Sequence, residues 1–239
     1  MDCGGRILDL AGPVVMGVLN ITPDSFSDGG AFMAPEAAIA HAQSMVDAGA
    51  VIIDIGGEST RPGAEGVDLH TELARVVPVI QALAPRLSVP LSVDTSKPAV
   101  MRAAAEAGAG ILNDVTGFRD PESLSVAAET GLPLCIMHMQ GRPATMQDDP
   151  RYDDVIAEVY EFLAGRIAAC EAAGVPPERL IIDPGFGFGK TNQHNARLLR
   201  ELERFRALGC PILVGLSRKG MIGRMTGRPK GERLAGKCC

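Results

Sequence analysis

Short apolar runs alternate along the chain with longer stretches in which apolar residues recur at helical spacing. The runs are continuous, rich in β-branched residues and bounded by Gly, Pro or Asp, which is typical of strands buried on both faces. They are Val14–Ile21, Val51–Ile55, Pro90–Asp94, Ile111–Val115, Leu132–Met139, Leu180–Asp183 and Pro211–Ser217. The pattern therefore predicts seven buried strands.

The stretches between these runs have the spacing of amphipathic helices. Most of them are followed directly by a glycine, the residue that most easily adopts the left-handed conformation that ends a helix. The predicted helices are Pro35–Ala48, Thr71–Leu83, Lys97–Ala107, Asp153–Ala173 and Asn195–Leu208. The strand-helix alternation predicts parallel strands joined by right-handed crossovers.

Two architectures fit this alternation, an open doubly wound sheet and a (β/α)8 barrel. The barrel is favoured because polar residues stand at the C-terminal end of nearly every predicted strand. A barrel gathers site residues from many strand ends, whereas an open sheet concentrates them at one switch point. We predict an α/β fold, a TIM (β/α)8-type barrel with only seven βα units, and one domain spanning residues 1–239 because no linker divides the chain.

Composition narrows the functional classes. The chain is 46% hydrophobic and 22% charged, an ordinary globular balance that excludes a disordered chain. Its net charge of −6 argues against nucleic acid or an anionic membrane as the main partner. No apolar run approaches the roughly 18 residues that span a bilayer, and no secretory signal is visible. Six cysteines without a C-x-x-C pair predict buried thiols in a reducing cytoplasm.

Polar side chains at the predicted strand ends carry the candidate chemistry. One Asp after a strand is often a helix cap or a turn former, but four acids at four strand ends indicate a shared site. In chain order, the strand-end residues are Asn20 and Thr22, Asp54, Asp94, Asn113 and Asp114, Met137 and His138, Asp183, and Ser217, Arg218 and Lys219. In a barrel these would converge on one mouth.

The residue types suggest what such a mouth would bind. Asp183 and Asn113 suit the amino and ring N–H groups of a flat heterocycle. Arg218 and Lys219 follow the last predicted strand, where barrels favour phosphate sites, and suit a phosphate or a carboxylate. Asn20 is a candidate oxygen ligand for Mg²⁺, with phosphate oxygens supplying other ligands. No set of thiolates or imidazoles suggests zinc.

Three loops are rich in glycine. Thr22–Gly30 and Gly56–Gly63 could close over a substrate or could simply be turns. Gly185–Thr191 resembles a phosphate-binding P-loop, but only three residues separate its first glycine from the Gly-Lys pair, where the motif needs four. We therefore reject an NTPase. Phe188 would pack over a flat ligand or into the barrel top, and His138 is interpreted as a hydrogen-bonded structural residue.

Several segments closely match one family. They strongly resemble dihydropteroate synthases, over nearly the whole chain from about residue 6 to residue 236. The matching segments are Met16–Gly30, Gly57–Gly63, Ser92–Thr95, Asn113–Val115, Asp183–Lys190 and Ser217–Lys219. The resemblance implies a TIM barrel of folate biosynthesis, a transferase that joins p-aminobenzoate to 6-hydroxymethyl-7,8-dihydropterin diphosphate and releases diphosphate.

The resemblance also implies roles for individual residues. Asn20 is the expected Mg²⁺ ligand, and Mg²⁺ the expected cofactor. The expected pterin-diphosphate residues are Thr60, Asp94, Asn113, Asp183 and Lys219, with Met137 and Phe188 lining the pocket. The expected p-aminobenzoate residues are Ser59, Arg61 and Pro62, with Phe26. Arg61 and Lys219 would position substrates, no general base is assigned, and sulfonamides are expected competitors.

Two departures from the family pattern change the expectation. Gly220 stands where the family usually has a serine that helps hold the aminobenzoate carboxylate. The family also continues through an eighth strand with an Arg-x-His motif and an eighth helix, whereas this sequence stops at Cys239. We therefore expect a C-terminally truncated chain with little activity and a weakened homodimer.

Two other functions stay open at this point. One is a catalytically weak pterin or sulfonamide binder. The other is a pterin-dependent methyltransferase, against which the Thr22–Gly30 and Ser217–Lys219 matches and the lack of a corrinoid-binding segment argue.

Overall fold

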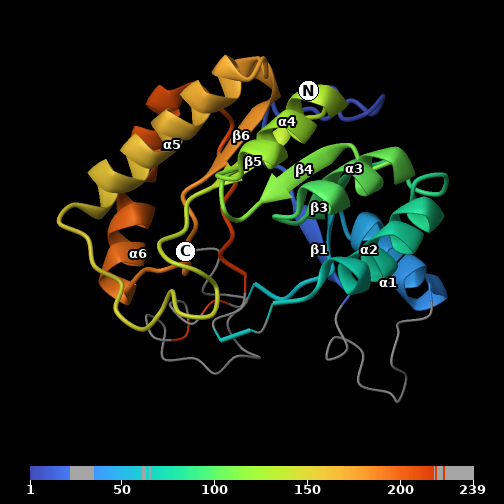
Figure 1. Cartoon of the computed structure of the whole chain (residues 1–239), viewed down its shortest axis with the longest axis horizontal. Coiled ribbons are helices and arrows are strands. Elements are labelled where there is room, and N and C mark those ends of the chain that lie inside the picture. The colour runs from blue at the N-terminus through green and yellow to red at the C-terminus, as the bar shows by residue number, and fades with distance from the viewer. Residues whose placement is uncertain (22–34, 61–62, 65, 218, 220–222, 224–239) are drawn as a thin grey trace.

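The computed structural model describes residues 1–21, 35–60, 63–64, 66–217, 219 and 223. In this part of the chain, strands and helices alternate and the strands form one parallel sheet (Figure 1). The strands are β1 (Met16–Asn20), β2 (Ile52–Gly56), β3 (Leu91–Asp94), β4 (Ile111–Asp114), β5 (Leu134–Met137) and β6 (Leu180–Asp183). The helices are α1 (Pro35–Asp47), α2 (Leu69–Leu83), α3 (Pro98–Ala107), α4 (Pro121–Thr130), α5 (Val155–Ala172) and α6 (Asn192–Arg200), with 3-10 helices η2 (Pro177–Arg179) and η3 (Leu202–Leu208).

The order of the strands identifies the architecture. Strands β1 to β6 lie side by side in chain order, and every neighbouring pair is parallel. A doubly wound sheet reverses its strand order at a switch point, so an unbroken succession of parallel neighbours is a barrel arrangement. The prediction of an α/β barrel rather than an open sheet is confirmed.

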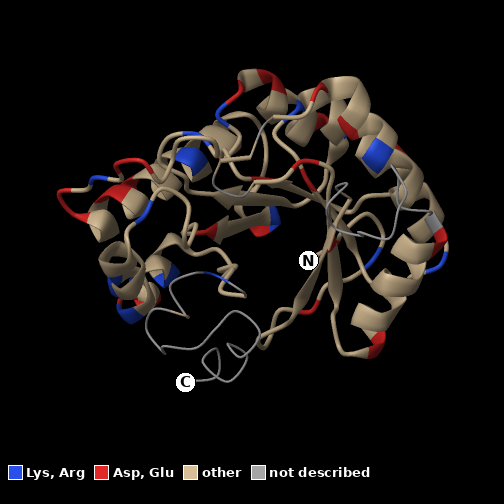
Figure 2. Cartoon of the chain, turned by 90° about the horizontal axis from the view of Figure 1, so that it is seen from below, with Lys and Arg blue, Asp and Glu red and all other residues tan. Residues whose placement is uncertain are grey.

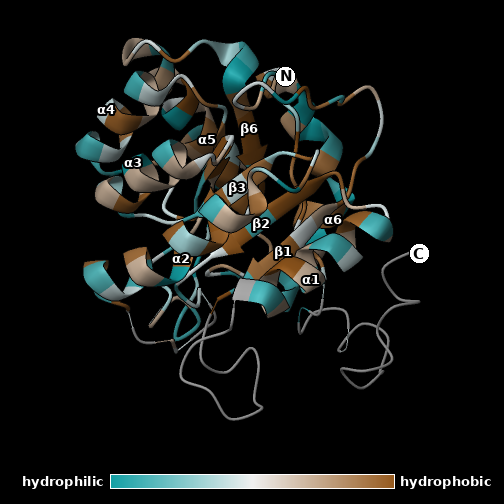
Figure 3. Cartoon of the chain, turned by 90° about the vertical axis from the view of Figure 1, so that its right-hand side faces the viewer, coloured by the Kyte–Doolittle hydropathy of each residue, from teal (hydrophilic) through white to brown (hydrophobic). Residues whose placement is uncertain are grey.

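The helices cover the outer side of this curved sheet. Figure 3 shows mainly hydrophobic strands inside and helices of mixed polarity around them. Figure 2 shows Lys, Arg, Asp and Glu spread over the outer helices. One large apolar cluster joins residues of the strands to the inward sides of the helices, including Ile53, Ile80 and Leu163, which are fully buried. No helix in the described part of the chain is both long enough and apolar enough to cross a membrane.

Helix α4 is the element that the hydrophobic pattern missed. Only Ser123, Val126 and Ala127 are buried on it, so its apolar face is too short to stand out. The residues at its two ends, Asp120 and Gly131, indicate the helix more clearly. The Asp120 carboxylate accepts a hydrogen bond from the Glu122 amide at 2.9 Å, and Gly131 follows the helix with a φ of 70°.

The predicted seventh strand, Pro211–Ser217, needs correction. The segment runs beside β6 in the predicted place, with Ile182 N–H donating to the Pro211 carbonyl at 2.9 Å and Leu213 N–H donating to the Ile182 carbonyl at 2.8 Å. It forms only one parallel bridge, between Ile182 and Ile212. Pro211 has no N–H to donate and Gly215 adds backbone freedom, and both weaken a strand. The described residues therefore form six strands rather than seven.

The N-terminal segment packs against the opposite end of the sheet from the predicted site. Cys3 and Leu8 are buried with Ile52 and Ile111, which lie at the beginnings of β2 and β4. Gly110 makes this contact possible, because a Cβ there would overlap the carbonyl group of Cys3. The segment thus covers the N-terminal ends of the strands.

We predict that Gly110→Ala destabilises the protein by about 1–3 kcal/mol, because the added methyl must displace the Cys3 backbone. Thermal or urea unfolding measures the effect. Gly165→Ala is the matched control. Gly165 lies inside α5 with no atom within 4 Å of the added methyl, so the variant should gain up to about 1 kcal/mol. Equal stabilities of the two variants would contradict the proposed contact.

Candidate functional site

Four neighbouring strands bring polar residues into one row at their C-terminal ends. Asn20 is in register with Gly56, Gly56 with Asp94, and Asp94 with Asn113. Residues in register on parallel strands point to the same face of the sheet. Gly56 leaves a gap in the row, since a Cβ there would lie 3.8 Å from Asn20 Oδ1 and 3.7 Å from Asp94 Oδ2. Asn20 and Asp94 therefore flank the same point, the position that a side chain at residue 56 would occupy.

The same face continues across β5 and β6. Asn113 is in register with Cys135, and Met137, two residues further along β5, is in register with Asp183. Since residues two apart on a strand share a face, Met137 and Asp183 join the row. Burial raises the pKa of Cys135 well above its usual range, and the nearby charges of Asp183 and Asp94 raise it further. The two carboxylates therefore lie within electrostatic reach of one thiol.

Asp54 belongs to this site although the sequence assigned it no individual role. It is 5% exposed and lies on β2, two residues before Gly56 and on the same face. The Asn113 side-chain Nδ2 lies 3.3 and 3.4 Å from the two Asp54 carboxylate oxygens and donates to them. Asp54 is thus the acceptor that holds the Asn113 amide.

Among the described residues, the charges that affect the pKa of Asp94 are all negative. Burial raises its pKa well above the usual range, and the negative charge of Asp54 raises it further. Asp94 Oδ1 is buried and has no hydrogen-bond partner among the described residues. A buried acceptor without a donor is costly, so this oxygen is suited to an N–H group from a ligand.

Asp183 lies opposite, beside two lysines. Its Oδ1 accepts a hydrogen bond from the Gly185 amide at 2.7 Å. Burial raises the pKa of Asp183, whereas the Gly185 amide and the positive charges of Lys219 and Lys190 act against this rise. Burial in turn lowers the pKa of Lys219, and Asp183 opposes that change. Lys219 and Asp183 therefore attract each other electrostatically.

Lys219 also contacts the loop that follows β6. Its ammonium donates to the Phe186 carbonyl and lies 4.2 Å from the centroid of the Phe188 ring. Phe188 packs against a small apolar cluster that includes Met137. The structure thus brings together four of the residues predicted for the pterin pocket: Met137, Asp183, Phe188 and Lys219.

The P-loop-like segment does not offer its lysine to a ligand. Lys190 is 3% exposed, and its Nζ lies 2.8 Å from His138 Nδ1, 2.9 Å from the Gly185 carbonyl oxygen and 3.1 Å from the Phe188 carbonyl oxygen. Burial lowers the pKa of Lys190 to about 7. Burial and the charge of Lys190 lower the pKa of His138 to about 2, so its neutral ring can accept from the ammonium. The pair fastens the loop after β5 to the loop after β6.

Gly185, Gly189 and Asn195 also help to hold the loop after β5 against the loop after β6. A Cβ on Gly185 would overlap the His138 carbonyl, and one on Gly189 would lie 2.5 Å from the Gln140 carbonyl oxygen. Asn195 on α6 accepts from the Gly187 amide at 2.7 Å. The sequence offered no signal for Asn195, because its role depends on α6 folding back onto the loop.

Asp114 has the local role that a strand-end acid often has. Its carboxylate accepts from the amides of Thr116 and Phe118, both at 2.8 Å, and thereby shapes the turn after β4. Phe118 has a φ of 54°, which is unusual for a residue with a side chain. Asp114 is therefore a turn former, in contrast to Asp94 and Asp183.

A partly buried ion-pair network supports the segment after β2. Lys97 Nζ lies 2.5 Å from Glu72 on α2 and also pairs with Glu58. The Arg75 guanidinium donates to the Gly57 carbonyl at 2.8 Å. These contacts fix the backbone immediately before Ser59 and Thr60, which are both half-buried. No sequence pattern indicated this network, because its members come from three separate parts of the chain.

Some predicted residues lie outside the described residues. Of the p-aminobenzoate residues these are Phe26, Arg61 and Pro62; Arg218 and Gly220 and the whole Thr22–Gly30 loop also lie outside. The Gly56–Gly63 loop is described except at residues 61–62, and the Gly63 amide donates to the Pro143 carbonyl at 3.3 Å. This contact places the loop after β2 beside the loop after β5.

The surroundings of Asn20 suit a hard cation. Among the described residues, no group of three or more His, Cys, Asp or Glu side chains could hold a metal ion. Mg²⁺, however, takes many of its ligands from water and phosphate oxygens and needs only one or two from the protein. The Asn20 carboxamide oxygen lies 3.8 Å from the position that a Cβ on Gly56 would take, on the side of the predicted site. This oxygen donor fits a Mg²⁺ ion that is shared with a phosphorylated ligand.

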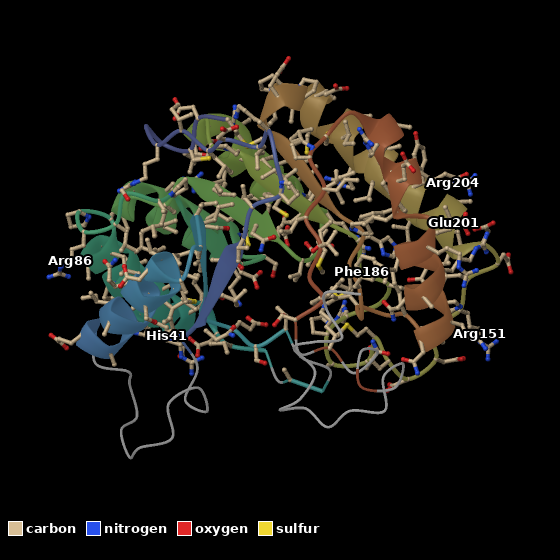
Figure 4. All side chains as sticks on the ribbon, turned by 180° about the vertical axis from the view of Figure 1, so that it is seen from behind. His41, Arg86, Arg151, Phe186, Glu201 and Arg204 are labelled. Atoms are coloured by element: carbon tan, nitrogen blue, oxygen red, sulfur yellow. The ribbon has the colours of Figure 1, made fainter. Side chains whose placement is uncertain are left out.

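A surface hollow of about 850 Å³ lies elsewhere, at the beginnings of α5 and α6. Its lining includes Arg151, Tyr152 and His194 and none of the predicted site residues that the structure describes. Figure 4 shows Arg151 at the periphery, whereas Phe186, next to the predicted site, lies in the interior. The polar row at the strand ends therefore remains the candidate site.

Comparison with known proteins identifies the family of this chain. The family model described as "Pterin binding enzyme" matches residues 16–239. The dihydropteroate synthase of Escherichia coli strain K12 is 55% identical over 232 residues, which are 97% of this chain and 82% of that protein.

Solved structures give the same result. A Xanthomonas albilineans dihydropteroate synthase with 4-aminobenzoic acid superposes with a TM-score of 0.92 at 54% identity, covering 98% of this chain and 84% of that one. A Yersinia pestis dihydropteroate synthase in a sulfonamide drug complex superposes with a TM-score of 0.92 at 51% identity. The match covers 99% of this chain and 86% of that one.

The Lys190 environment predicts a specific pH dependence of stability. Its pKa is about 7 in the folded protein, against an ordinary value of 10.5. A lysine with a lowered pKa carries a stability cost that is fully present below pH 7 and is relieved as the pH rises toward 10.5. Relative to Lys190→Met, the wild type should therefore gain up to about 1.4 kcal/mol per pH unit across this window. Urea unfolding at several pH values measures this difference, and a pH-independent difference would contradict it.

Proposed function

The chain belongs to the dihydropteroate synthase family of pterin-binding enzymes, and from this premise we propose how it acts. It joins 6-hydroxymethyl-7,8-dihydropterin diphosphate to p-aminobenzoate, forming 7,8-dihydropteroate and diphosphate. The observation that carries the proposal is the row of oxygen acceptors on one face of the sheet at the strand ends. A pterin ring offers amino and ring N–H donors to such a row.

The pterin ring binds between the two halves of the site. Asp94 Oδ1 lacks a partner among the described residues, and the Asp183 carboxylate accepts from only one amide there. Asp94, Asn113 and Asp183 receive the ring's N–H groups, and Thr60 contributes a hydroxyl. Met137 and Phe188 pack against the ring. Lys219, which pairs electrostatically with Asp183, adds a positive charge for an oxygen of the substrate.

The reaction is a substitution at the exocyclic CH2 group of the pterin. The C–O bond to diphosphate breaks, the aryl amine forms a C–N bond to the same carbon, and the amine proton passes to the released diphosphate or to water. The pterin ring can delocalise positive charge from this carbon, which favours a dissociative path. The neutral amine is already nucleophilic, so it needs orientation rather than a strong base. No general base is therefore assigned.

Asn20 is the proposed protein ligand of a Mg²⁺ ion. When bound, the ion would neutralise charge on the departing diphosphate. Asn20 itself contributes an uncharged oxygen next to Gly56. An amide ligand adds no negative charge close to Asp94, which already has an unfavourable concentration of carboxylates around it.

The second substrate is proposed to bind along the loops after β1 and β2. Ser59 and Arg61 with Pro62 and Phe26 are the proposed p-aminobenzoate residues, and Arg61 and Lys219 orient the substrates. The Xanthomonas relative holds 4-aminobenzoic acid and the Yersinia relative is in a sulfonamide drug complex. We extend both ligand classes to this chain, with sulfonamides as competitors of p-aminobenzoate.

We also propose a cytoplasmic location and a homodimer. The four cysteines in the described residues, Cys3, Cys135, Cys170 and Cys210, are all free and buried, which suits a reducing compartment. The homodimer rests on the family resemblance alone, and sedimentation equilibrium tests it.

An assay of diphosphate release, run beside a titration of pterin binding, tests the function. Turnover that needs both substrates supports the synthase. Pterin binding without turnover would instead support the alternative, a catalytically weak pterin or sulfonamide binder.

We predict that Asp183→Ala abolishes measurable binding of the pterin diphosphate. The change leaves ring N–H groups without an acceptor, which costs about 1–3 kcal/mol of binding free energy for each group. It also removes the negative charge that attracts Lys219. Calorimetry measures the affinity, with the exposed Asp149→Ala as the matched control. An affinity within a few-fold of wild type would remove Asp183 from the pterin site.

We predict that Asn20→Ala raises the Mg²⁺ concentration needed for half-maximal turnover by about 10-fold, since one oxygen ligand is lost. Asn20→Asp keeps an oxygen and should retain Mg²⁺ dependence. Binding of the pterin without its diphosphate should change little in either variant. An unchanged Mg²⁺ requirement in Asn20→Ala would show that Asn20 is not a ligand.

A further inference from the structure

Asp54 lies on β2, next to the row formed by Asn20, Asp94 and Asn113. Both oxygens of its carboxylate accept from the side-chain Nδ2 of Asn113. We propose that Asp54 is a positioning residue that fixes the Asn113 amide with its oxygen turned toward the pterin. The inference rests on the proposed function, because it concerns the same pterin site. It gives a specific role to Asp54, for which neither the motifs nor the family resemblance assigned one.

The register explains why these two side chains meet. Asp54 on β2 is in register with Ser92 on β3, and Ser92 is in register with Ile111 on β4. Asn113 lies two residues beyond Ile111 and on the same face. The small side chain of Ser92 leaves room for Asn113 to reach across β3 to Asp54. The two Nδ2–O distances, 3.3 and 3.4 Å, show that the amide is shared by both oxygens.

The chemistry of the pair sets the direction of the amide. An ionised carboxylate can only accept hydrogen bonds, whereas an amide has one donating end and one accepting end. Asn113 must therefore present Nδ2 to Asp54, which leaves Oδ1 directed elsewhere. Asn113 is 8% exposed, and the reversed amide would place oxygen against oxygen in a site with little water. A single orientation results, with an acceptor left for a ligand N–H group.

The neighbouring groups favour the ionised form more at Asp54 than at Asp94. Burial raises the pKa of both Asp54 and Asp94, but the rise is larger at Asp94. At Asp94 the charge of Asp54 and the charges of three further acids add to the effect of burial. At Asp54 the Ser92 hydroxyl and the Asn113 amide act against it. The Asn113 amide thus stabilises the ionised form of Asp54, which is the form that accepts from Nδ2 at both oxygens.

The proposal predicts a rescue that a packing role would not produce. Asp54→Asn offers Asn113 both a donor and an acceptor, so the amide can adopt either direction. Asn113→Asp brings a third carboxylate next to Asp54 and Asp94. In the double variant the new amide at position 54 donates to the new carboxylate at position 113, whose second oxygen faces the ligand whichever way it turns. The double variant therefore restores the arrangement with donor and acceptor exchanged.

The experiment measures calorimetric affinity for 6-hydroxymethyl-7,8-dihydropterin diphosphate in the wild type, D54N, N113D and the double variant, with thermal unfolding as a check of folding. We expect each single variant to bind about 10- to 100-fold more weakly. We expect the double variant to recover to within about five-fold of wild type, because the pair again has one donor and one acceptor. Wild-type affinity in D54N, or losses that multiply in the double variant, would overturn the inference while leaving the proposed function intact.

A second measurement on the unaltered protein covers the case in which a variant does not fold. The Asn113 side-chain NH2 resonances, followed by nuclear magnetic resonance, should be protected from solvent exchange and should shift little when the pterin diphosphate binds. A large shift would place NH2 rather than oxygen against the ligand and overturn the inference. Absence of pterin binding by the wild type would instead overturn the proposed function, and this inference with it.

Discussion

The register of a parallel sheet is the constraint on which the rest of this structure depends. Strands β1, β2 and β3 end in register with Asn113 of β4, so Asn20, Asp94 and Asn113 lie in one row that Gly56 interrupts. A shift of one residue in any strand would turn its polar side chain to the other face. The alignment therefore converts residues that are well separated in the chain into one recognition surface, and the apolar core and the helices fix it in place.

The site contains buried carboxylates that repel each other and that a ligand can stabilise. Asp54 and Asp94 are held near each other in a poorly solvated space, and burial raises the pKa of both. A hydrogen bond from a neutral N–H group stabilises a carboxylate without adding a charge that must itself be desolvated. An uncharged heterocycle with several N–H donors can therefore satisfy these carboxylates. The positive side chain of Lys219 stands on the opposite side, next to Asp183.

The loops around the site depend on contacts that are too close for ordinary side chains. Gly185 and Gly189 lie against the backbone of residues 138 and 140, and Lys190 fills the space between them with hydrogen bonds to three backbone carbonyls and His138. The loop after β2 is fixed in another way, through the ion pairs of Lys97 with Glu58 and Glu72. These contacts fix the backbone close to Phe188 and Thr60.

The sequence by itself determined most of the elements. Continuous apolar runs predict buried strands and a glycine predicts the end of a helix, because both signals are local. Local signals were too weak in two places. The apolar face of α4 is short, and the Pro211–Ser217 segment contains a proline and a glycine that weaken a strand. The sequence also indicated Asn20, Asp94, Asn113 and Asp183, since a polar residue at the end of a buried strand is visible in one dimension. The tertiary structure alone decided that Asp114 shapes a turn while Asp54 holds Asn113. It likewise decided that Lys190 faces His138 and that Lys97 joins Glu58 to Glu72. These partners lie far apart in the chain, and only the packing of separate elements determines which charges and donors meet.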